Sequence, residues 1–260
     1  MNHQQGKIIT ISSVKGGVGK TTIAINLAGI YFLMKKKVLL IDLDLYAGGI
    51  ATCLNVNNRK DIYSLIDNMS NNNSVSIEDY VCHYNSGIDV LACPKDPRDV
   101  SKIEPKYINQ IFALAKSRYD VILVDTGHSL DEVCLMAIDE SYNSIFVITN
   151  DLVDIKNMKS LVSIFNDMKK TNYKIVLNNS RDTGRDYITV FDIRNMIKAN
   201  IDFTISKGFY IKNIDKYVLN GEILTLNNTI RRFNSGDIKN FEKLATAIIA
   251  SDKEAGDGDE

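Results

Sequence analysis

The sequence has little of what marks a membrane, secreted or nucleic-acid-coating protein. Its longest apolar-leaning stretch, residues 23–34, contains Asn26 and Gly29 and falls short of the roughly 20 apolar residues that a membrane-spanning helix needs. The first residues lack the charged and then apolar pattern of a secretory signal. The net charge is -1 and the pI about 6.3, so no global positive field attracts nucleic acid or anionic lipid. We expect a cytoplasmic protein, with a buried helix at 23–34.

Cysteine and histidine are scarce, and neither forms a motif. No two cysteines stand in a CxxC pattern, so neither a zinc knuckle nor a redox dithiol is predicted. The histidines make no pair with metal-ligand spacing. We interpret the cysteines as small buried side chains in a reducing compartment. The residues are Cys53, Cys82, Cys93, Cys134, His3, His83 and His128.

Apolar, β-branched runs alternate along the chain with segments of helical periodicity. This alternation is typical of a parallel sheet covered by helices on both faces. The predicted strands are residues 7–13, 37–42, 88–92, 120–125, 144–149, 173–178 and 201–205, and the predicted helices are 21–35, 106–117, 130–140, 154–169, 187–199 and 241–250. We expect one α/β domain over residues 1–250, with a mostly parallel, twisted sheet of about seven or eight strands.

Two polar segments fall outside this pattern. Residues 61–79 include three successive asparagines, 71–73, and we expect short helices and a mobile loop there. Residues 251–260 end in EAGDGDE, an acidic and glycine-rich composition that is typical of a disordered tail.

The strongest functional signal is a glycine-rich stretch between the first predicted strand and helix, where residues 15–22 read KGGVGKTT. Glycines let the backbone curl so that several N–H groups point at phosphate oxygens, and the helix offers its positive end to the anion. A plain turn before a helix is the alternative, which the spacing of glycines, lysine and threonines disfavours. The expected nucleotide contacts are Gly16, Gly17, Val18, Gly19, Lys20, Thr21 and Thr22.

Three of these side chains have distinct expected roles. Lys20 reaches the β- and γ-phosphates, the Thr21 hydroxyl ligates Mg²⁺, and Thr22 contacts the α-phosphate. These roles predict ATP and Mg²⁺ as the bound cofactors.

Carboxylates follow two of the predicted strands, at the edge where ligands bind in open α/β sheets. Asp42 and Asp44 are two residues apart, so an extended backbone points both the same way. Asp125 follows four apolar residues, a pattern that holds magnesium through water in phosphate-loop proteins. Gly127 comes soon after, where the backbone is free to respond to a γ-phosphate. Surface turn acids, and a buried strand that merely ends in Asp, are the alternatives.

The loop resembles the deviant phosphate loop of the ParA/MinD class of dimeric ATPases. The general pattern has glycine at position 14, where this chain has Val14, followed by an additional lysine, Lys15. The resemblance covers most of residues 7–249 and implies a P-loop NTPase fold, ATP hydrolysis and a homodimer in the ATP state. Beyond the loop it extends to Asp42, Asp44, Asp125 and Asn178.

The resemblance also implies roles for single residues. Lys15 crosses to the partner subunit's nucleotide and offsets charge on the transferring phosphoryl group, as an arginine finger would. Asp44 orients or activates the attacking water, and Asp42 holds a magnesium-bound water or the Thr21 hydroxyl. The expected catalytic residues are therefore Lys15, Lys20 and Asp44, and the expected metal site is Thr21, Asp42 and Asp125.

For the adenine base, the resemblance points to an asparagine at the end of a strand. Asn178 matches this position best, with Asn179 as the fallback, and a capping asparagine is the alternative. The family often places Pro and Asp beside the base after the next strand. Here residues 206–208 read SKG, which departs from that pattern and weakens the expected selectivity for adenine.

Within the class, two segments look like CpaE/TadZ proteins, ATPases that place pilus-assembly machinery at a cell pole. Residues 42–51 read DLDLYAGGIA and residues 220–224 read NGEIL. Partition proteins usually carry Pro and Gln in the first segment, and both are missing. We expect a slow, partner-regulated ATPase that acts on protein partners of a localisation, secretion or pilus system, at a cell pole or on a membrane through those partners. A partition or MinD-like division protein, a scaffold with negligible turnover, and a metabolic ATPase stay open.

Surface charge bears on other partners. MinD-type proteins end in a basic amphipathic helix, whereas this chain ends in an acidic tail that anionic lipid would repel, so no C-terminal membrane-targeting helix is expected. Arg231 and Arg232 are a candidate DNA contact, although two arginines are more often a solvated helix start. The lysines at 35–37 suit the negative end of the first helix.

Overall fold

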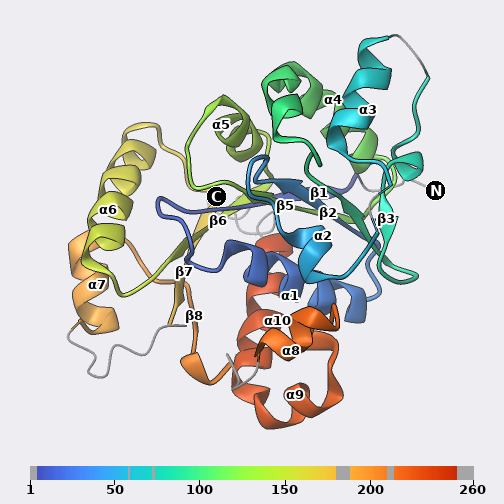
Figure 1. Cartoon of the computed structure of the whole chain (residues 1–260). Helices are drawn as coiled ribbons and strands as arrows, with labels where there is room; N and C mark the ends of the chain where they lie inside the picture. Colours follow the sequence, from blue (N-terminus) through green and yellow to red (C-terminus); the bar gives the residue numbers. More distant parts are fainter. Residues whose placement is uncertain (1–4, 58, 72–73, 180–187, 210–213, 251–260) are drawn as a thin grey trace, which may run out of the picture.

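A single sheet organises the chain in the computed structural model (Figure 1), which describes residues 5–57, 59–71, 74–179, 188–209 and 214–250. Its strands lie in the order β3-β4-β2-β5-β1-β6-β7-β8, and every pairing is parallel except that of β3 with β4. The strands are β1 (Lys7–Ser12), β2 (Val38–Leu43), β3 (Cys82–His83), β4 (Ile88–Leu91), β5 (Val121–Thr126), β6 (Asn143–Ile148), β7 (Tyr173–Asn178) and β8 (Phe203–Ile205).

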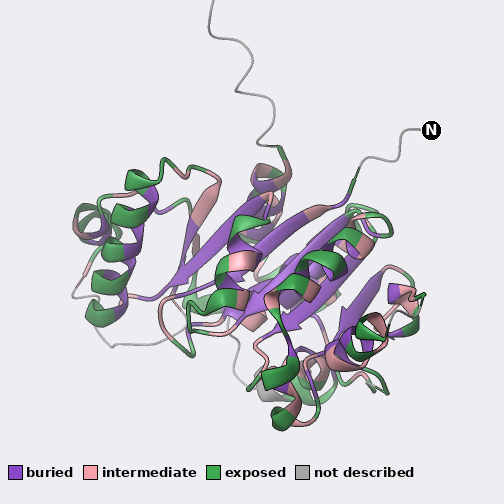
Figure 2. Cartoon of the chain, turned by 90° about the horizontal axis from the view of Figure 1, so that it is seen from above, coloured by how far each residue is buried: buried purple, intermediate pink, exposed green. Residues whose placement is uncertain are grey.

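The central strands are buried along their whole length, which explains their continuous apolar runs. Every residue of β2, β5 and β6 is buried, and the sheet is the buried layer in Figure 2. Side chains alternate between two cores: Ile9 and Ile11 face one, and Ile8 faces the other. The prediction of a mostly parallel sheet covered on both faces is confirmed. Strand β3 was not predicted, because two residues carry no periodic signal.

Helices cover both faces of the sheet (Figure 1). One face carries α1 (Lys20–Leu33), α2 (Ile50–Cys53), α8 (Ile214–Leu219), α9 (Asn228–Phe233) and α10 (Ser235–Ala250), and the other carries α3 (Ile62–Ser70), α4 (Pro105–Lys116), α5 (Glu132–Asp139), α6 (Leu152–Asp167) and α7 (Val190–Ile197). Short 3₁₀ turns are η1 (Ile77–Asp79), η2 (Pro97–Lys102), η3 (Lys207–Phe209) and η4 (Leu224–Leu226).

Helix α1 is the buried helix that the sequence predicted. It lies between the sheet and the C-terminal segments, so it is apolar almost all round. Tyr31 donates a hydrogen bond to the Ala245 carbonyl over 3.0 Å. A Cβ on Gly29 would stand 2.3 Å from the Thr225 hydroxyl oxygen, so only glycine allows this close approach. The packing fixes the helix whose first turn follows the glycine-rich loop.

The less regular segments agree in part with expectation. Residues 61–79 contain α3 and η1, the expected short helices, and the predicted closing helix forms the second half of α10. The expected mobile loop falls partly on residues 72–73, and the expected tail is residues 251–260; both lie outside the described residues. Among the described helices, none has the length and apolar character needed to cross a membrane.

Candidate functional site

The glycine-rich loop connects the buried end of β1 to the start of α1, at the carboxyl edge of the sheet. Gly17 and Gly19 have φ of 72° and 98°, left-handed values that favour glycine. Gly19 is the N-cap of α1 and supplies no side-chain cap, so the first N–H groups of the helix remain available to an anion. The loop therefore has the backbone shape that phosphate binding requires.

Below the loop, Asn178 holds the backbone in place. Its side-chain amide donates to the Val18 carbonyl over 2.7 Å, and Asn178 itself is 1% exposed. This contact commits the amide to the loop. Contact with an adenine base, the role expected for Asn178, stays a prediction.

Lys20 begins α1 with its side chain turned back under the loop. Only 7% of the residue is exposed, and its ammonium donates to the Ser13 hydroxyl over 3.2 Å. Ser13 in turn donates to the Lys15 carbonyl over 2.7 Å. Sequence reasoning did not single out Ser13, which links the two lysines of the loop.

Two carboxylates lie side by side beneath the first turn of α1. Asp42 and Asp125 are partners in the β2–β5 register, and each is 1% exposed. The Thr21 hydroxyl donates to Asp125 Oδ2 over 2.6 Å. Asp42 accepts backbone N–H groups from Asp44 and Ile50. The structure thus brings together the three residues of the predicted metal site.

Burial and mutual repulsion make this pair unusually basic. Burial, reinforced by the neighbouring Asp42, raises the pKa of Asp125 to about 8, and the contacts with Thr21 and Lys20 only partly offset this. Burial raises the pKa of Asp42 to about 7, against the lowering effect of its backbone hydrogen bonds. A bound cation would stabilise the ionised form of both carboxylates.

Asp44 lies at the rim of the same site. Its backbone N–H donates to Asp42 Oδ1 over 3.2 Å, and a Cβ on Gly127 would stand 3.5 Å from Asp44 Oδ1. The residue is half-buried, in contrast to the two carboxylates beneath it. Asp44 therefore lies beside the turn after β5 and is partly exposed to solvent.

Lys15 does not point into its own loop. Its ammonium lies 3.0 Å from Asp151 Oδ1, at the N-cap of α6. The lysine lowers the pKa of Asp151. Nothing in the local sequence indicated a role for Asp151 or His128. The His128 ring lies against the loop, because a Cβ on Gly16 would stand 3.6 Å from its Cγ atom.

The residues fit a nucleotide with a divalent cation. Asp125 Oδ1 is buried without a hydrogen-bond partner in the described structure, and Thr21, Asp42 and Asp125 form a hard oxygen set of the kind that Mg²⁺ prefers. Within the same residues, no group of three or more His, Cys, Asp and Glu side chains suffices to hold a metal. Further ligands would have to come from phosphate oxygens and water, as is usual for Mg²⁺.

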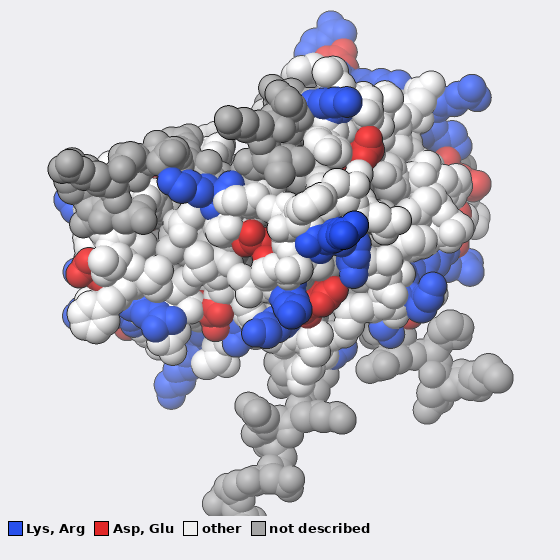
Figure 3. All heavy atoms as spheres, turned by 90° about the horizontal axis from the view of Figure 1, so that it is seen from below, with Lys and Arg blue, Asp and Glu red and all other residues white. Residues whose placement is uncertain are grey.

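Other predicted residues have structural partners. Ser206, in the segment that departs from the family pattern, donates to Asp237 on α10. Arg231 donates to the Thr225 carbonyl and pairs with Glu242, so of the two arginines only Arg232 is exposed. On the face that carries α8–α10, acidic side chains lie among the basic ones (Figure 3).

The four cysteines are free thiols. Cys82 and Cys134 are buried as expected, whereas Cys53 and Cys93 are only half-buried and lie near the site. Burial first, and then Asp42, raise the pKa of the Cys93 thiol to about 12. A protonated thiol is a poor nucleophile and metal ligand, which agrees with the absence of a redox motif.

Comparison with known proteins identifies the family. The AAA_31 family model, described as an AAA domain, matches residues 6–179. The chain belongs to this family. The match spans the loop, both buried carboxylates and Asn178.

Individual relatives agree with the family assignment. The chain is 27% identical over 256 residues to the chromosome-partitioning ATPase Soj of Treponema pallidum (strain Nichols), covering 95% of this chain and 98% of Soj. A ParA family ATPase from Chlorobium tepidum TLS has the same fold, with a TM-score of 0.76, 24% identity and coverage of 92% and 98%. The septum site-determining protein MinD of Pyrococcus horikoshii OT3, solved with Mg-ADP, matches with a TM-score of 0.73, 22% identity and coverage of 96% and 98%.

Proposed function

We propose that the chain binds ATP with Mg²⁺ at this loop, hydrolyses it slowly, and forms a homodimer in the ATP state. The observation that carries the proposal is the hydrogen bond from Thr21 to Asp125, beside buried Asp42 and directly after Lys20. Thr21, Asp42 and Asp125 hold the cation, directly or through water. Bound Mg²⁺ would neutralise charge on the phosphates. Lys20 binds the β- and γ-phosphates, and Asp44 orients the attacking water.

The dimer is proposed because of Lys15. Its side chain pairs with Asp151, away from the Lys20 ammonium under the loop. In the dimer this side chain would leave Asp151 and act on the neighbouring subunit's nucleotide, where a cation stabilises charge on the transferring phosphoryl group. Nucleotide binding and dimerisation would therefore be coupled, and hydrolysis would end the coupled state.

For the biological role, we propose a spatial regulator of the CpaE/TadZ type that localises pilus-assembly machinery through protein partners. The two segments that carry this resemblance lie close together in the fold. Gly221, with φ of 68°, lies so near α2 that a Cβ would stand 2.4 Å from the Leu54 carbonyl oxygen. In the other segment, a Cβ on Gly48 would stand 2.6 Å from Asp42 Oδ2. Packing thus requires both glycines, Gly48 beside Asp42 and Gly221 at the end of α2.

A partition or division-positioning role is the second candidate, and the likeness to Soj and MinD favours it. For a partition role, DNA contact would have to rely on Arg232 and the exposed lysines of α10, because Arg231 is engaged within the fold. This candidate shares the ATP-driven dimer and differs only in the surface that the dimer binds.

Phosphate release tests the hydrolysis. We expect slow, Mg²⁺-dependent release from the native chain, lost in Asp44→Ala and retained in Asp67→Ala, which removes an exposed carboxylate on α3. If the native chain and Asp44→Ala both released phosphate only at the background rate, the proposal of hydrolysis would be wrong. The chain would then be a nucleotide-dependent scaffold.

Fluorescent tagging in the native cell tests the role. Polar foci support the pilus proposal, coating of the nucleoid supports partition, and oscillation on the membrane supports division positioning. The same fusion carrying Lys20→Ala is the control, because localisation that survives loss of nucleotide binding does not depend on the ATP switch.

A further inference from the structure

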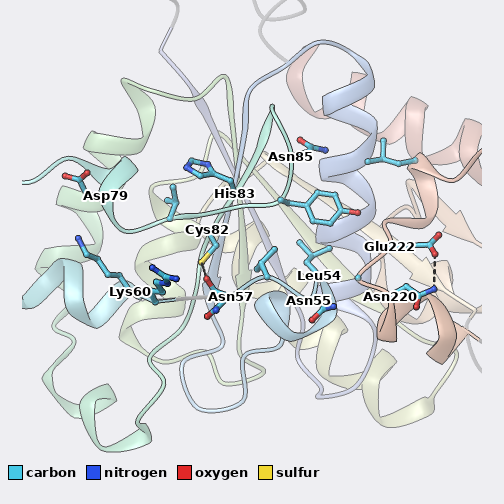
Figure 4. A pocket seen from close by; sticks show the side chains of 16 residues that line it. Leu54, Asn55, Asn57, Lys60, Asp79, Cys82, His83, Asn85, Asn220 and Glu222 are labelled. Atoms are coloured by element: carbon cyan, nitrogen blue, oxygen red, sulfur yellow. Dashed lines mark hydrogen bonds between the residues drawn. The ribbon is translucent and has the colours of Figure 1, made fainter.

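A cavity of about 980 Å³ lies along the free edge of β3, at the end of the sheet. Strands β4, β2 and β5 separate it from β1 and the phosphate loop. One wall is residues 81–85, the opposite wall is residues 54–57 with Arg59 and Lys60, and one end is residues 220–222 with Leu226. We call this cavity the edge slot (Figure 4). Its volume is at the upper end of the range of about 300–1,000 Å³ that is common for ligand sites.

The slot runs against the backbone of β3. Side chains of a strand alternate between its two faces, and those of residues 81–85 do so here: Cys82 and Tyr84 pack on one core, and Val81 packs on the other. A cavity that touches all five successive residues must therefore lie along the strand edge, beside the main chain. Main-chain hydrogen bonding is the chemistry that such a position offers.

The main chain of His83 faces the slot. Tyr84 N–H donates to the Ile88 carbonyl over 3.0 Å, and Ile88 N–H donates to Asn85 Oδ1. The main-chain bond between Tyr84 and Ile88, next to the β3–β4 ladder, therefore has the position of a hydrogen-bonded pair. In an antiparallel ladder such pairs alternate with pairs that exchange no hydrogen bonds. The pair of His83 with Asp89 is of the second kind. The N–H and C=O of His83 point away from β4, towards the open edge.

Two buried residues, Asp89 and Tyr119, hold the exposed His83 side chain through successive hydrogen bonds. The Tyr119 hydroxyl donates to Asp89 Oδ2 over 2.8 Å, and Asp89 Oδ1 lies 2.6 Å from His83 Nδ1. The Asp89 side chain is 8% exposed, whereas that of His83 is 69% exposed. Asp89 holds Nδ1, so Nε2 is the ring nitrogen that makes no contact with this carboxylate. The edge is therefore preorganised for a partner, which lowers the entropy cost of pairing.

The charges at the two ends of the slot differ in sign. Lys60 lies at one end with Asp79, next in the chain to Arg59, which also lines the slot, and Glu222 lies at the other end beside Asn220. Asparagine side chains, which both donate and accept hydrogen bonds, line the length between them at 55, 57 and 85. This lining suits a segment with polar main-chain groups throughout, an acidic residue at one end and a basic residue at the other.

We propose that the edge slot binds an extended peptide segment of a partner protein, which pairs with the His83 main chain as an added strand. Strand addition takes its affinity from main-chain hydrogen bonds and its direction from side chains at the ends. The charge difference along the slot sets that direction. The site is independent of the nucleotide site and would serve as the contact through which a partner is recruited.

Selection of peptides from a phage-displayed library of random linear peptides on the full chain tests the proposal. Enriched peptides are synthesised and their affinity is measured by calorimetry. We expect Asn57→Trp, which places a ring in the slot, to weaken them about tenfold or more. Asn166→Trp, at an exposed position of α6 on the other face of the sheet, should leave the affinity unchanged. Unchanged nucleotide binding in both variants shows that they fold; if Asn57→Trp does not fold, Asn220→Trp fills the opposite end.

Two further measurements separate strand addition from other modes. N-methylation of alternate peptide amides should remove binding, and the His83 amide should gain protection from hydrogen exchange in the complex. Peptides that tolerate both N-methylation and Asn57→Trp, or a selection that yields no peptide sensitive to Asn57→Trp, would overturn the proposal. So would a labelled single-stranded oligonucleotide that binds in the slot and displaces the peptides.

Discussion

Lys15 and Asp151 form an ion pair within one chain, with Nζ 3.0 Å from Oδ1. Asp151 is held in place because it also caps α6, accepting the N–H groups of Val153 and Asp154. Under the proposed function the same lysine acts on the partner subunit's nucleotide. The pair with Asp151 and the contact across the dimer therefore compete for one ammonium group, and the monomer keeps Lys15 occupied until a dimer forms.

Asp151→Asn should strengthen the ATP-dependent dimer, because it removes the competing carboxylate and retains a good capping side chain. Both partners are partly exposed, at 30% and 39%, and exposed ion pairs contribute about 0–1 kcal/mol each. Because each of the two protomers releases one pair, the gain is at most about 2 kcal/mol, or about thirtyfold in the dimer Kd. Sedimentation velocity with ATP and Mg²⁺ measures it. A dimer no tighter than the native one would show that the pair does not restrain Lys15.

Lys15→Ala should separate binding from dimerisation. Lys15 donates nothing to the loop that holds Lys20, since only its backbone carbonyl accepts from Ser13. We expect the Kd for ATP to stay within a few fold of the native value, while ATP-driven dimerisation and phosphate release are lost. Fluorescent-nucleotide titration and light scattering give the two readouts. Loss of ATP binding itself would contradict the role across the dimer.

Lys20→Ala should strongly weaken nucleotide binding. The buried ammonium is the cation under the loop, and hydrogen bonds to charged groups contribute about 1.5–3 kcal/mol, so the Kd rises about ten- to hundredfold. Titration with a fluorescent ADP analogue measures the change. Lys159→Ala, on the exposed side of α6, is the matched control and should bind as the native chain does.

The sequence predicted the parts of the site that follow one another along the chain. The loop, the strands and the acids at 42 and 125 are local patterns, and strand order then places the acids side by side. Contacts between distant segments could not be predicted in this way. Asn178 meets Val18 across 160 residues, and Asp151 meets Lys15 because β6 pairs with β1. Strand β3 was also not predictable, because it pairs with β4 through only two residues, Cys82 and His83.

Asn178→Ala distinguishes support of the loop from recognition of the base. Removing the amide leaves the buried Val18 carbonyl without this donor, which costs about 1–3 kcal/mol, so unfolding should occur at a lower denaturant concentration. If the amide only supports the loop, ATP and GTP should weaken together, because both use the same phosphate contacts. Titration of both nucleotides, native against variant, decides between the roles. A loss confined to ATP would assign Asn178 to the adenine edge.

The buried pair Asp42 and Asp125 should make the cation-free chain less stable as pH rises. Their folded pKa values are about 7 and about 8, above the unfolded value near 3.9. From about pH 4 to about pH 8 the folded chain therefore binds more protons than the unfolded chain, and stability falls with increasing pH. Thermal unfolding in EDTA should show a midpoint several degrees lower at about pH 8 than at about pH 5.5.

Asp125→Asn should make the midpoint depend less on pH, since it removes the carboxylate with the higher pKa and its repulsion of Asp42. Mg²⁺ with nucleotide should restore the unfolding midpoint at the higher pH. If Asp125→Asn left the pH dependence unchanged, groups other than this pair would cause it.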